Sequence, residues 1–188
     1  MADPSNTLPE LLQDGLDVVF VGINPSLYSA AQGHYFARRT NRFWPCFSQS
    51  AVSEAARRAL GLVRLEPEHD RILPSHGFGF TDLVKRPTAR ASDLTPSELR
   101  SGVANLASKL ERYQPRIACF HGMTGYRHIL RGLSPAAPDP VLGTQMLRIG
   151  VTRCFVVPNP SGANAHFTPA EQVGWYDRLA DELSQGRA

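Results

Sequence analysis

Apolar residues fall along this chain in two alternating patterns. Short runs of consecutive apolar residues are typical of buried strands, whereas other segments repeat apolar residues at helical spacing. Strands are expected at residues 17–23, 78–84, 116–120, 144–149 and 153–157. Helices are expected at residues 41–47, 53–60, 95–113, 121–130 and 168–183, with loops at 24–40, 85–94 and 134–140. This alternation predicts an α/β fold, a three-layer α-β-α sandwich with a central, mainly parallel sheet.

Polar residues at the predicted helix starts support these boundaries. Asn41 and Thr95 precede helical patterns as N-caps do, and Thr168 stands before the last helix. Residues 1–8 are polar and contain proline, which predicts a frayed start. Neither a repeat nor a linker-like segment interrupts the pattern, so the sequence predicts a single domain over residues 1–188.

Composition and charge agree with one globular domain and add a hint about its partner. The chain has 188 residues, of which 42% are hydrophobic, enough for a proper core. Its formal net charge is +3, and basic residues gather in the predicted loops at 38–42 and 85–90. If these loops converge, they form a surface suited to a polyanion.

Cysteine usage and hydropathy exclude several other classes of protein. Cys46, Cys119 and Cys154 lie far apart without a CxxC pair, a spacing that predicts neither a metal site nor a disulfide framework. No signal peptide and no apolar run of about 18 residues is visible, so we expect a cytoplasmic protein with no membrane partner.

Two short polar strings carry most of the chemical information. Gly22-Ile23-Asn24-Pro25-Ser26 and Asn159-Pro160-Ser161-Gly162 each directly follow a predicted buried strand. In an open α/β sheet, the loops at the carboxyl ends of the strands form the ligand crevice. We therefore expect the two strings to meet there and to outline an active site.

Five blocks occur in an order that resembles a known enzyme family. They are 22–26 (GINPS), 36–37 (FA), 41–44 (NRFW), 85–88 (KRPT) and 159–162 (NPSG). In this order they resemble the mismatch-specific uracil/thymine-DNA glycosylases of the uracil-DNA glycosylase superfamily, from about residue 17 to the last helix.

The resemblance implies a uracil-DNA glycosylase-like fold and a specific reaction on double-stranded DNA. Such a monofunctional enzyme, which uses no cofactor, flips uracil, and sometimes thymine, out of a mispair with guanine. It then hydrolyses the N-glycosidic bond and so starts base excision repair. A mispaired base is extruded at the lowest energetic cost. We expect a monomer.

The resemblance also implies roles for residues of the first blocks. Asn24 matches the position that holds the attacking water through its side-chain amide, which cannot itself accept the proton of that water. Backbone N–H groups of Ile23 and Ser26 are expected to serve the carbonyl oxygens of the base. Phe36 matches the aromatic residue that stacks on the flipped base.

The second string is expected to contact the DNA and to fill the gap left by the flipped nucleotide. Asn159 heads this DNA-binding string, and Ser161 and Gly162 would reach a phosphate through a hydroxyl and a backbone N–H. Arg86 would follow the DNA backbone. The next residue, Ala163, departs from related enzymes, which often carry Leu and Arg there, and it is too small to act as a wedge. Asn164, or else His166 or Phe167, would have to substitute for it.

A carboxylate near the water would complete the site. Asp93, in the loop at 85–94, is the first candidate for a general base or for stabilising the sugar cation, with a helix-flanking role as the alternative. Asp82, inside the predicted strand, is the second. His121 and His34 are further polar candidates that we expect to be structural.

Three alternatives compete with a mismatch-specific enzyme. The Ala163 departure favours a broader uracil-DNA glycosylase that also acts on U:A pairs and single strands. A damage-binding protein with weak catalysis is opposed by the intact Asn24. A dinucleotide-binding protein is disfavoured because no GxGxxG follows the first strand and Pro25 lacks an N–H.

Overall fold

The computed structural model describes residues 7–185. Within them, one sheet contains the strands β1 (Val18–Gly22), β2 (Phe78–Asp82), β3 (Ile117–His121), β4 (Gly143–Ile149) and β5 (Thr152–Val157). The α-helices are α1 (Leu27–Gln32), α2 (Phe43–Gln49), α3 (Glu54–Leu60), α4 (Pro96–Tyr113), α5 (Met123–Leu133) and α6 (Pro169–Gln185). Short 3₁₀ turns lie at η1 (Ala51–Ser53), η2 (Pro67–Arg71), η3 (Leu73–His76) and η4 (Ala91–Asp93).

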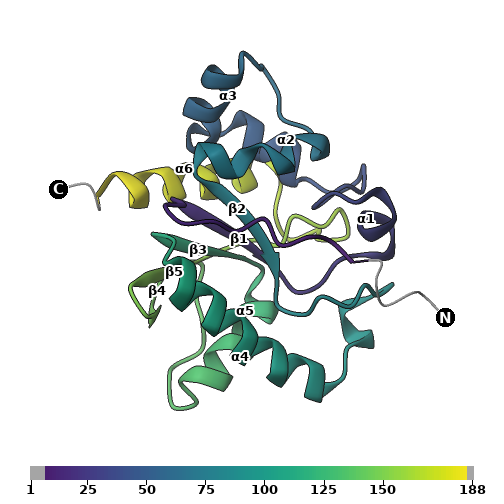
Figure 1. Ribbon diagram of the computed structural model, residues 1–188, viewed down its shortest axis with the longest axis vertical. Helices are drawn as coiled ribbons and strands as arrows, with labels where there is room; N and C mark the ends of the chain where they lie inside the picture. The colour runs from purple at the N-terminus through teal and green to yellow at the C-terminus, as the bar shows by residue number, and fades with distance from the viewer. Residues whose placement is uncertain (1–6, 186–188) are drawn as a thin grey trace.

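The sheet is mainly parallel and lies between two helical layers. Its strand order is β2-β1-β3-β5-β4, and only β4, which pairs with β5, runs antiparallel. Helices α2, α3 and α6 cover one face of the sheet, and α4 and α5 cover the other (Figure 1). The predicted α-β-α sandwich with a central, mainly parallel sheet is confirmed.

Alternation along the strands divides the core into an aromatic and an aliphatic half. Phe20 of β1 points into the aromatic half, where its ring lies 5.1 Å from that of Phe43 and 5.3 Å from that of Phe47. Its neighbours Val19 and Val21 point to the opposite face, against α4 and α5. Because β1 is covered on both faces of the sheet, its successive side chains are all buried, and its sequence is a continuous apolar run.

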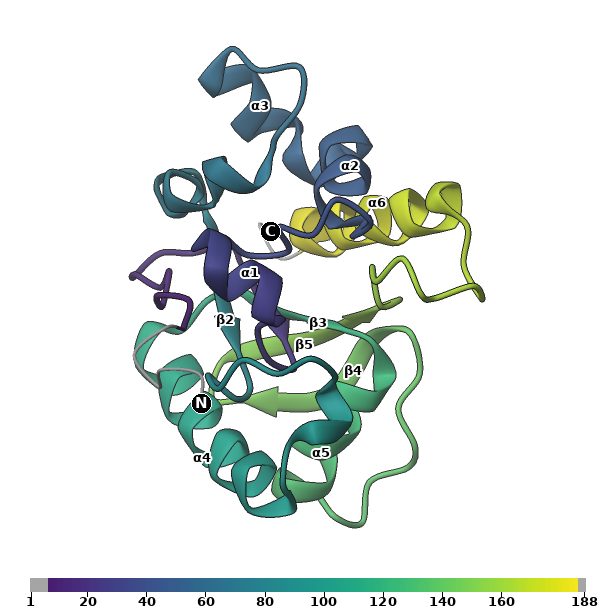
Figure 2. The same ribbon diagram turned by 90° about the vertical axis from the view of Figure 1, so that its right-hand side faces the viewer.

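Helix α1 lies within the segment 24–40, where the sequence predicted only a loop. Ser26 caps it, with its Oγ accepting from the N–H of Ser29 at 3.1 Å, and Gly33 ends it with a φ of 74°. Figure 2 shows α1 in front of the sheet, between the two helical layers. The prediction of a long loop is therefore wrong for Leu27–Gln32.

Other predicted boundaries need smaller corrections. Arg42, rather than Asn41, is the residue before α2, although Asn41 Oδ1 still accepts from the N–H of Phe43 at 2.9 Å. The prediction of a frayed start over residues 1–8 is wrong for Leu8, which is buried in the core, and for Thr7, whose hydroxyl donates to the Lys85 carbonyl. Residues 1–6 lie outside the described part of the chain.

The caps predicted for the two longest helices are confirmed. Thr95 Oγ1 accepts from the N–H of Glu98 at 3.2 Å, and Thr168 Oγ1 accepts from the N–H of Glu171 at the same distance. These caps fix where the loops before α4 and α6 end, and both loops border the site described below. No helix in the described range is long and apolar enough to cross a membrane.

Candidate active site

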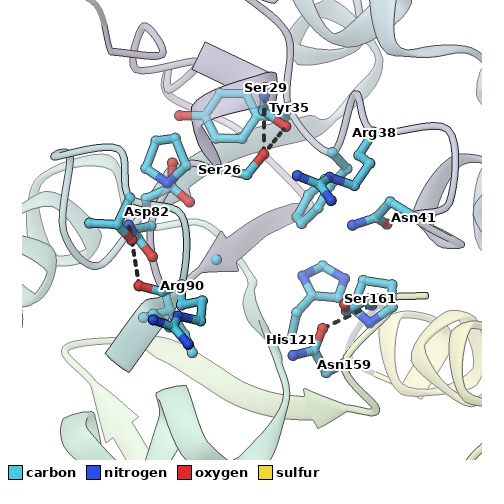
Figure 3. A pocket seen from close by; sticks show the side chains of 18 of the residues that line it. Ser26, Ser29, Tyr35, Arg38, Asn41, Asp82, Arg90, His121, Asn159 and Ser161 are labelled. Carbon is cyan, nitrogen blue, oxygen red and sulfur yellow. Dashed lines mark hydrogen bonds between the residues drawn. The ribbon is translucent and has the colours of Figure 1, made fainter. Parts of the chain in front are cut away.

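A cavity of about 540 Å³ opens at the carboxyl ends of the parallel strands (Figure 3). Both polar strings contribute to its lining, as expected for loops at this edge of an α/β sheet. Of the candidate site residues singled out in the sequence, the structure brings nine to this cavity: Ile23, Asn24, Ser26, Phe36, Asp82, His121, Asn159, Ser161 and Ala163. Arg86, Asp93, Gly162 and Asn164 are not among its lining residues.

The Asn24 side chain is held in one orientation by the loop that follows β2. Its Nδ2 donates to the backbone carbonyl of Arg86 at 2.9 Å and to Thr88 Oγ1 at 2.7 Å. Both amide hydrogens are therefore committed, and Oδ1 remains as the atom that can accept a hydrogen bond from water. Thr88 is itself buried and donates to the Arg90 carbonyl at 2.7 Å.

A parallel bridge between Ser26 and Thr88 joins the first string to the same loop. The N–H of Thr88 donates to the Pro25 carbonyl at 3.1 Å, and the N–H of Leu27 donates to the Thr88 carbonyl at 3.3 Å. The Ser26 hydroxyl caps α1, so this side chain orders the turn. The use of the Ile23 and Ser26 N–H groups by a bound base stays a prediction.

Phe36 forms an aromatic wall of the cavity. Its ring stacks on Phe43 with centroids 4.4 Å apart and an interplanar angle of 24°, and it meets the His121 ring edge-on at 4.9 Å. Its backbone φ is 53°, a left-handed conformation that a bulky residue adopts only when its surroundings impose it. Phe36 is only half-buried and lines the cavity, so it can present a ring face to a ligand.

The second string forms a compact turn on the opposite side of the cavity. Asn159 Oδ1 accepts from the N–H of Ser161 at 2.9 Å, which Figure 3 shows as a dashed line. The Asn159 carbonyl accepts from Asn164 Nδ2, also at 2.9 Å. Asn164 is thus committed to the turn, and its Oδ1 further accepts from the N–H of His166 at 3.2 Å. Ala163 is exposed at the rim.

This turn is anchored on the loop that precedes α2. The N–H of Arg42 donates to the Pro160 carbonyl at 2.8 Å. A Cβ atom on Gly162 would lie 2.5 Å from the Thr40 carbonyl oxygen, so only glycine allows the two loops to approach this closely. Gly162 therefore has a packing role, and its contact with DNA stays a prediction.

Asp82, the last residue of β2, lies at the bottom of one side of the cavity. It is 3% exposed, and its Oδ2 has no hydrogen-bond partner among the described residues. Burial raises the pKa of its carboxyl to about 7, although the nearby Lys85 ammonium acts to lower it. The cavity is lined by Asp82, the second candidate from the sequence, and not by Asp93, the first.

Asp93 and Arg86 support the loop between β2 and α4. The Asp93 carboxylate accepts from the N–H of Arg90 at 3.0 Å, as a cap of η4. The Arg86 guanidinium donates to Glu98 Oε2 and to the Asp93 carbonyl, each at 3.0 Å. This pairing lowers the pKa of Glu98 to about 2. Neither residue lines the cavity, although the Arg86 carbonyl accepts from the Asn24 amide, and the roles of the two residues in catalysis and DNA binding stay predictions.

The two candidate histidines occupy different environments. His34 Nδ1 lies 3.0 Å from the buried Asp70 carboxylate, a structural contact that fixes the start of the 34–41 segment. His121, at the end of β3, lines the cavity and is paired through Nε2 with the Tyr176 hydroxyl at 3.0 Å. Burial lowers the pKa of His121 to about 3, so its ring is neutral.

Sequence reasoning underestimated two residues of this site. Thr88 was visible only as a member of the KRPT block, and nothing in the chain indicated that its hydroxyl would hold the Asn24 amide. Asp82 was seen, but the burial that perturbs it depends on tertiary packing. Arg38 and Arg90 line the cavity from opposite sides, in agreement with convergence of the two basic loops (Figure 3).

The cavity combines a side-chain amide held in one orientation, that of Asn24, with an aromatic wall formed by Phe36. Within residues 7–185, no group of three or more His, Cys, Asp or Glu side chains is arranged to hold a metal ion.

The family model of the Uracil DNA glycosylase superfamily matches residues 9–180, which includes both polar strings and every strand. The protein therefore belongs to the Uracil DNA glycosylase superfamily, whose members are DNA glycosylases.

Proposed function

We propose that the protein is a monofunctional, mismatch-specific glycosylase that removes uracil from G:U mispairs in double-stranded DNA. Superfamily membership supports glycosylase chemistry on DNA. The finer assignment rests on the five sequence blocks and on the fixed orientation of Asn24 in the cavity. That orientation is the observation on which the proposal depends most.

The geometry around Asn24 fits the positioning of an attacking water. Because Nδ2 donates to two fixed acceptors, Oδ1 can accept from a water without a competing rotation of the amide. Phe36 offers a stacking surface for an extruded base on the neighbouring wall of the same cavity.

The reaction is a hydrolysis in which the bond between the base nitrogen and C1′ breaks. The bonding electron pair leaves with uracil, positive charge develops on the sugar, and the water oxygen bonds to C1′. One water proton is released and the uracil anion takes up a proton. Asn24 contributes by holding the water in line, and donors around the base stabilise the negative charge on its oxygens.

Single-turnover excision by Asn24→Ala tests this function. We expect the parental protein to release uracil opposite guanine, and the variant to be slower by about two orders of magnitude or more. Binding to a duplex that carries a cleavage-resistant 2′-fluorinated deoxyuridine should stay nearly unchanged in the variant. Parallel losses of binding and excision would instead make Asn24 a structural turn residue.

A broader uracil-DNA glycosylase is the second candidate, favoured by the state of the turn after Asn159. Ala163 is small, and Asn164 is committed to hydrogen bonds within the turn, so neither offers a free side chain to fill the gap in the duplex. The same assay on G:U, G:T and A:U duplexes and on single strands separates the candidates. A strong preference for G:U supports mismatch specificity, whereas similar rates on all uracil substrates support the broad enzyme.

A further inference from the structure

A groove of about 530 Å³ lies between residues 96–104 of α4 and residues 128–133 of α5. We call it the α4–α5 groove. None of its lining residues also lines the cavity described above. The two helices form the outer layer on their side of the sheet (Figure 1), and most residues of the groove are exposed. The groove is therefore open to a ligand from solvent.

The floor of the α4–α5 groove is apolar. Leu99 and Val103 lie four residues apart on one face of α4, and Leu133 comes from the end of α5. Val103 is 6% exposed and belongs to the aliphatic half of the core, so the groove reaches down to core residues. Leu133 is 38% exposed. Apolar side chains gathered on a surface in this way are typical of interaction sites.

Two small residues keep the groove open. Gly132 of α5 packs against α4, where a Cβ atom would lie 2.8 Å from Val103 Cγ1. Glycine weakens a helix relative to alanine, and the close approach of the two helices is the physical reason for it here. Ala104 of α4 is exposed and adds only a methyl group to the lining. Longer side chains at these two positions would fill the space between the helices.

The rim of the groove is cationic. Arg100 of α4 is exposed and makes no ion pair or hydrogen bond through its guanidinium to any residue within 7–185. Arg131 and His128 lie three residues apart on α5, a helix that contains no Asp or Glu. Arg131 donates to the Asp139 carboxylate at 2.8 Å. Asp139 is 67% exposed, so this pair contributes little to stability, and another carboxylate can replace it.

We propose that the α4–α5 groove binds an acidic amphipathic helix of a partner protein. Such a helix would place apolar side chains, spaced i, i+3 or i+4 and i+7, against Leu99, Val103 and Leu133. Its Asp and Glu side chains would flank this stripe and pair with Arg100 and Arg131. The inference goes beyond the proposed function, because the residues of the groove take no part in the excision of uracil.

Other occupants fit the groove less well. A DNA backbone would pair with the cations but would leave the apolar floor without a partner. A second copy of the chain would have to supply an acidic helix with a free apolar face. Among the described helices, α6 has the most acidic residues, but Tyr176 and Leu179 bury its apolar face in the aromatic half of the core. The apolar floor and the cationic rim together therefore favour a different protein.

NMR spectra of the whole ¹⁵N-labelled chain test the inference with two synthetic peptides. Both are about 16 residues long, enough to form a helix on binding, and carry the same leucines at helical spacing. The flanking positions are glutamate in one peptide and lysine in the other. We expect the acidic peptide to shift the backbone amide signals of 99–104 and 128–133. It should bind at least about tenfold more tightly than the basic peptide.

Substitutions in α4 test the floor and the rim separately. Ala104→Glu places a carboxylate inside the groove and should weaken binding of the acidic peptide by about tenfold or more. Asn105→Glu, at the next position and outside the groove, is the matched control and should leave binding nearly unchanged. Arg100→Glu should weaken binding of the acidic peptide and strengthen binding of the basic one. Thermal unfolding and uracil excision should stay close to parental in all three variants, because the three positions are exposed and lie outside the cavity.

Three outcomes would overturn the inference. Amide shifts confined to other surfaces, or no shifts at millimolar peptide, would show that the groove does not take a helix. Equal affinities of the two peptides, with no effect of Arg100→Glu, would remove the charge on which the choice of an acidic partner depends. Self-association of the parental chain in sedimentation experiments, abolished by Ala104→Glu, would make a second copy the occupant.

Discussion

Thr88 is the residue that decides how the Asn24 amide faces the cavity. Its hydroxyl accepts from Asn24 Nδ2 at 2.7 Å and donates to the Arg90 carbonyl at 2.7 Å. An amide whose nitrogen lost this acceptor could rotate and present N–H groups, instead of Oδ1, to the cavity. The Thr88 hydroxyl thus fixes the orientation of the Asn24 amide, on which the proposed positioning of a water depends.

We expect Thr88→Val to slow uracil excision by about 10- to 100-fold, because a small misplacement of a reacting group has a large effect on rate. Valine keeps the shape of threonine but removes the acceptor. Thr88→Ser, which keeps the hydroxyl, is the matched control and should stay close to the parental rate. Single-turnover assays on a G:U duplex measure both, and equal losses in both variants would contradict the orienting role.

The aspartates show which features of a site the sequence can predict and which it cannot. The positions of Asn24 and Asn159 could be predicted, because each follows an apolar strand and parallel strands end at the same edge of a sheet. That Asp82, and not Asp93, lines the cavity could not be predicted. The parity of Asp82 along β2 indicates its face of the sheet, but not that this face is left uncovered at the end of the strand.

At the scale of elements, helix α1 could not be predicted from the pattern of apolar residues. Its cap at Ser26 and its end at Gly33 follow ordinary rules. Its large apolar residues, Leu27 and Tyr28, are exposed, while its buried residues are Ser29 and Ala30. The segment therefore lacks the apolar periodicity by which longer helices such as α4 are recognised.

The turn at 159–164 and the loop before α2 behave as one unit held by close packing at Gly162. We expect Gly162→Ala to force these loops apart, since its Cβ would lie 2.5 Å from the Thr40 oxygen. Overpacking of this kind destabilises proteins by about 1–3 kcal/mol. Thermal unfolding measures this loss, and DNA binding should weaken with it.

Gly174 of α6 provides the control for this substitution, because nothing lies within 4 Å of a Cβ built there. Gly174→Ala adds the same methyl group within a helix, where alanine is favoured over glycine. The protein should keep or gain stability. A Gly162→Ala variant as stable as the parental protein would show that the two loops can move apart freely.

Across the whole molecule, the basic residues near the cavity divide into two groups. Arg38 and Arg90 line the cavity from opposite sides, and the Arg90 side chain is 82% exposed, with only a long contact of 3.8 Å to the Asp93 carboxylate. Arg86 is paired with Glu98 through two nitrogen atoms. A guanidinium that is already neutralised releases fewer counterions from DNA than an exposed one.

We therefore expect Arg38→Gln and Arg90→Gln each to reduce the salt dependence of DNA binding by about one unit of log Kd against log salt concentration. Arg86→Gln should change this slope less. Fluorescence titrations of a uracil-containing duplex at several salt concentrations measure the slopes. Unchanged slopes for both Arg38→Gln and Arg90→Gln would place the DNA on another surface.

Asp82 and His121 give the folded protein two opposite dependences on pH. The pKa of Asp82 is raised to about 7 in the folded state from 3.8, so its contribution to stability is lost as the pH rises toward 7. The pKa of His121 is lowered to about 3 from 6.5, so its contribution is lost as the pH falls toward 3. Near pH 5 the folded state holds one proton on Asp82, and the unfolded state holds one on His121. The two effects cancel there.

The Asp82→Asn substitution removes the contribution of Asp82 to the pH dependence of stability and leaves that of His121. Between pH 4.5 and 6.5, the free energy of unfolding of the variant should rise relative to that of the parental protein by about 1.4 kcal/mol for each pH unit. The slope of the difference is informative whatever the stability of the variant at any single pH, because the substitution offsets the whole curve by a constant. Urea titrations across this range measure it. A difference that is independent of pH would mean that Asp82 ionises in the ordinary range in the folded protein, and that burial does not raise its pKa.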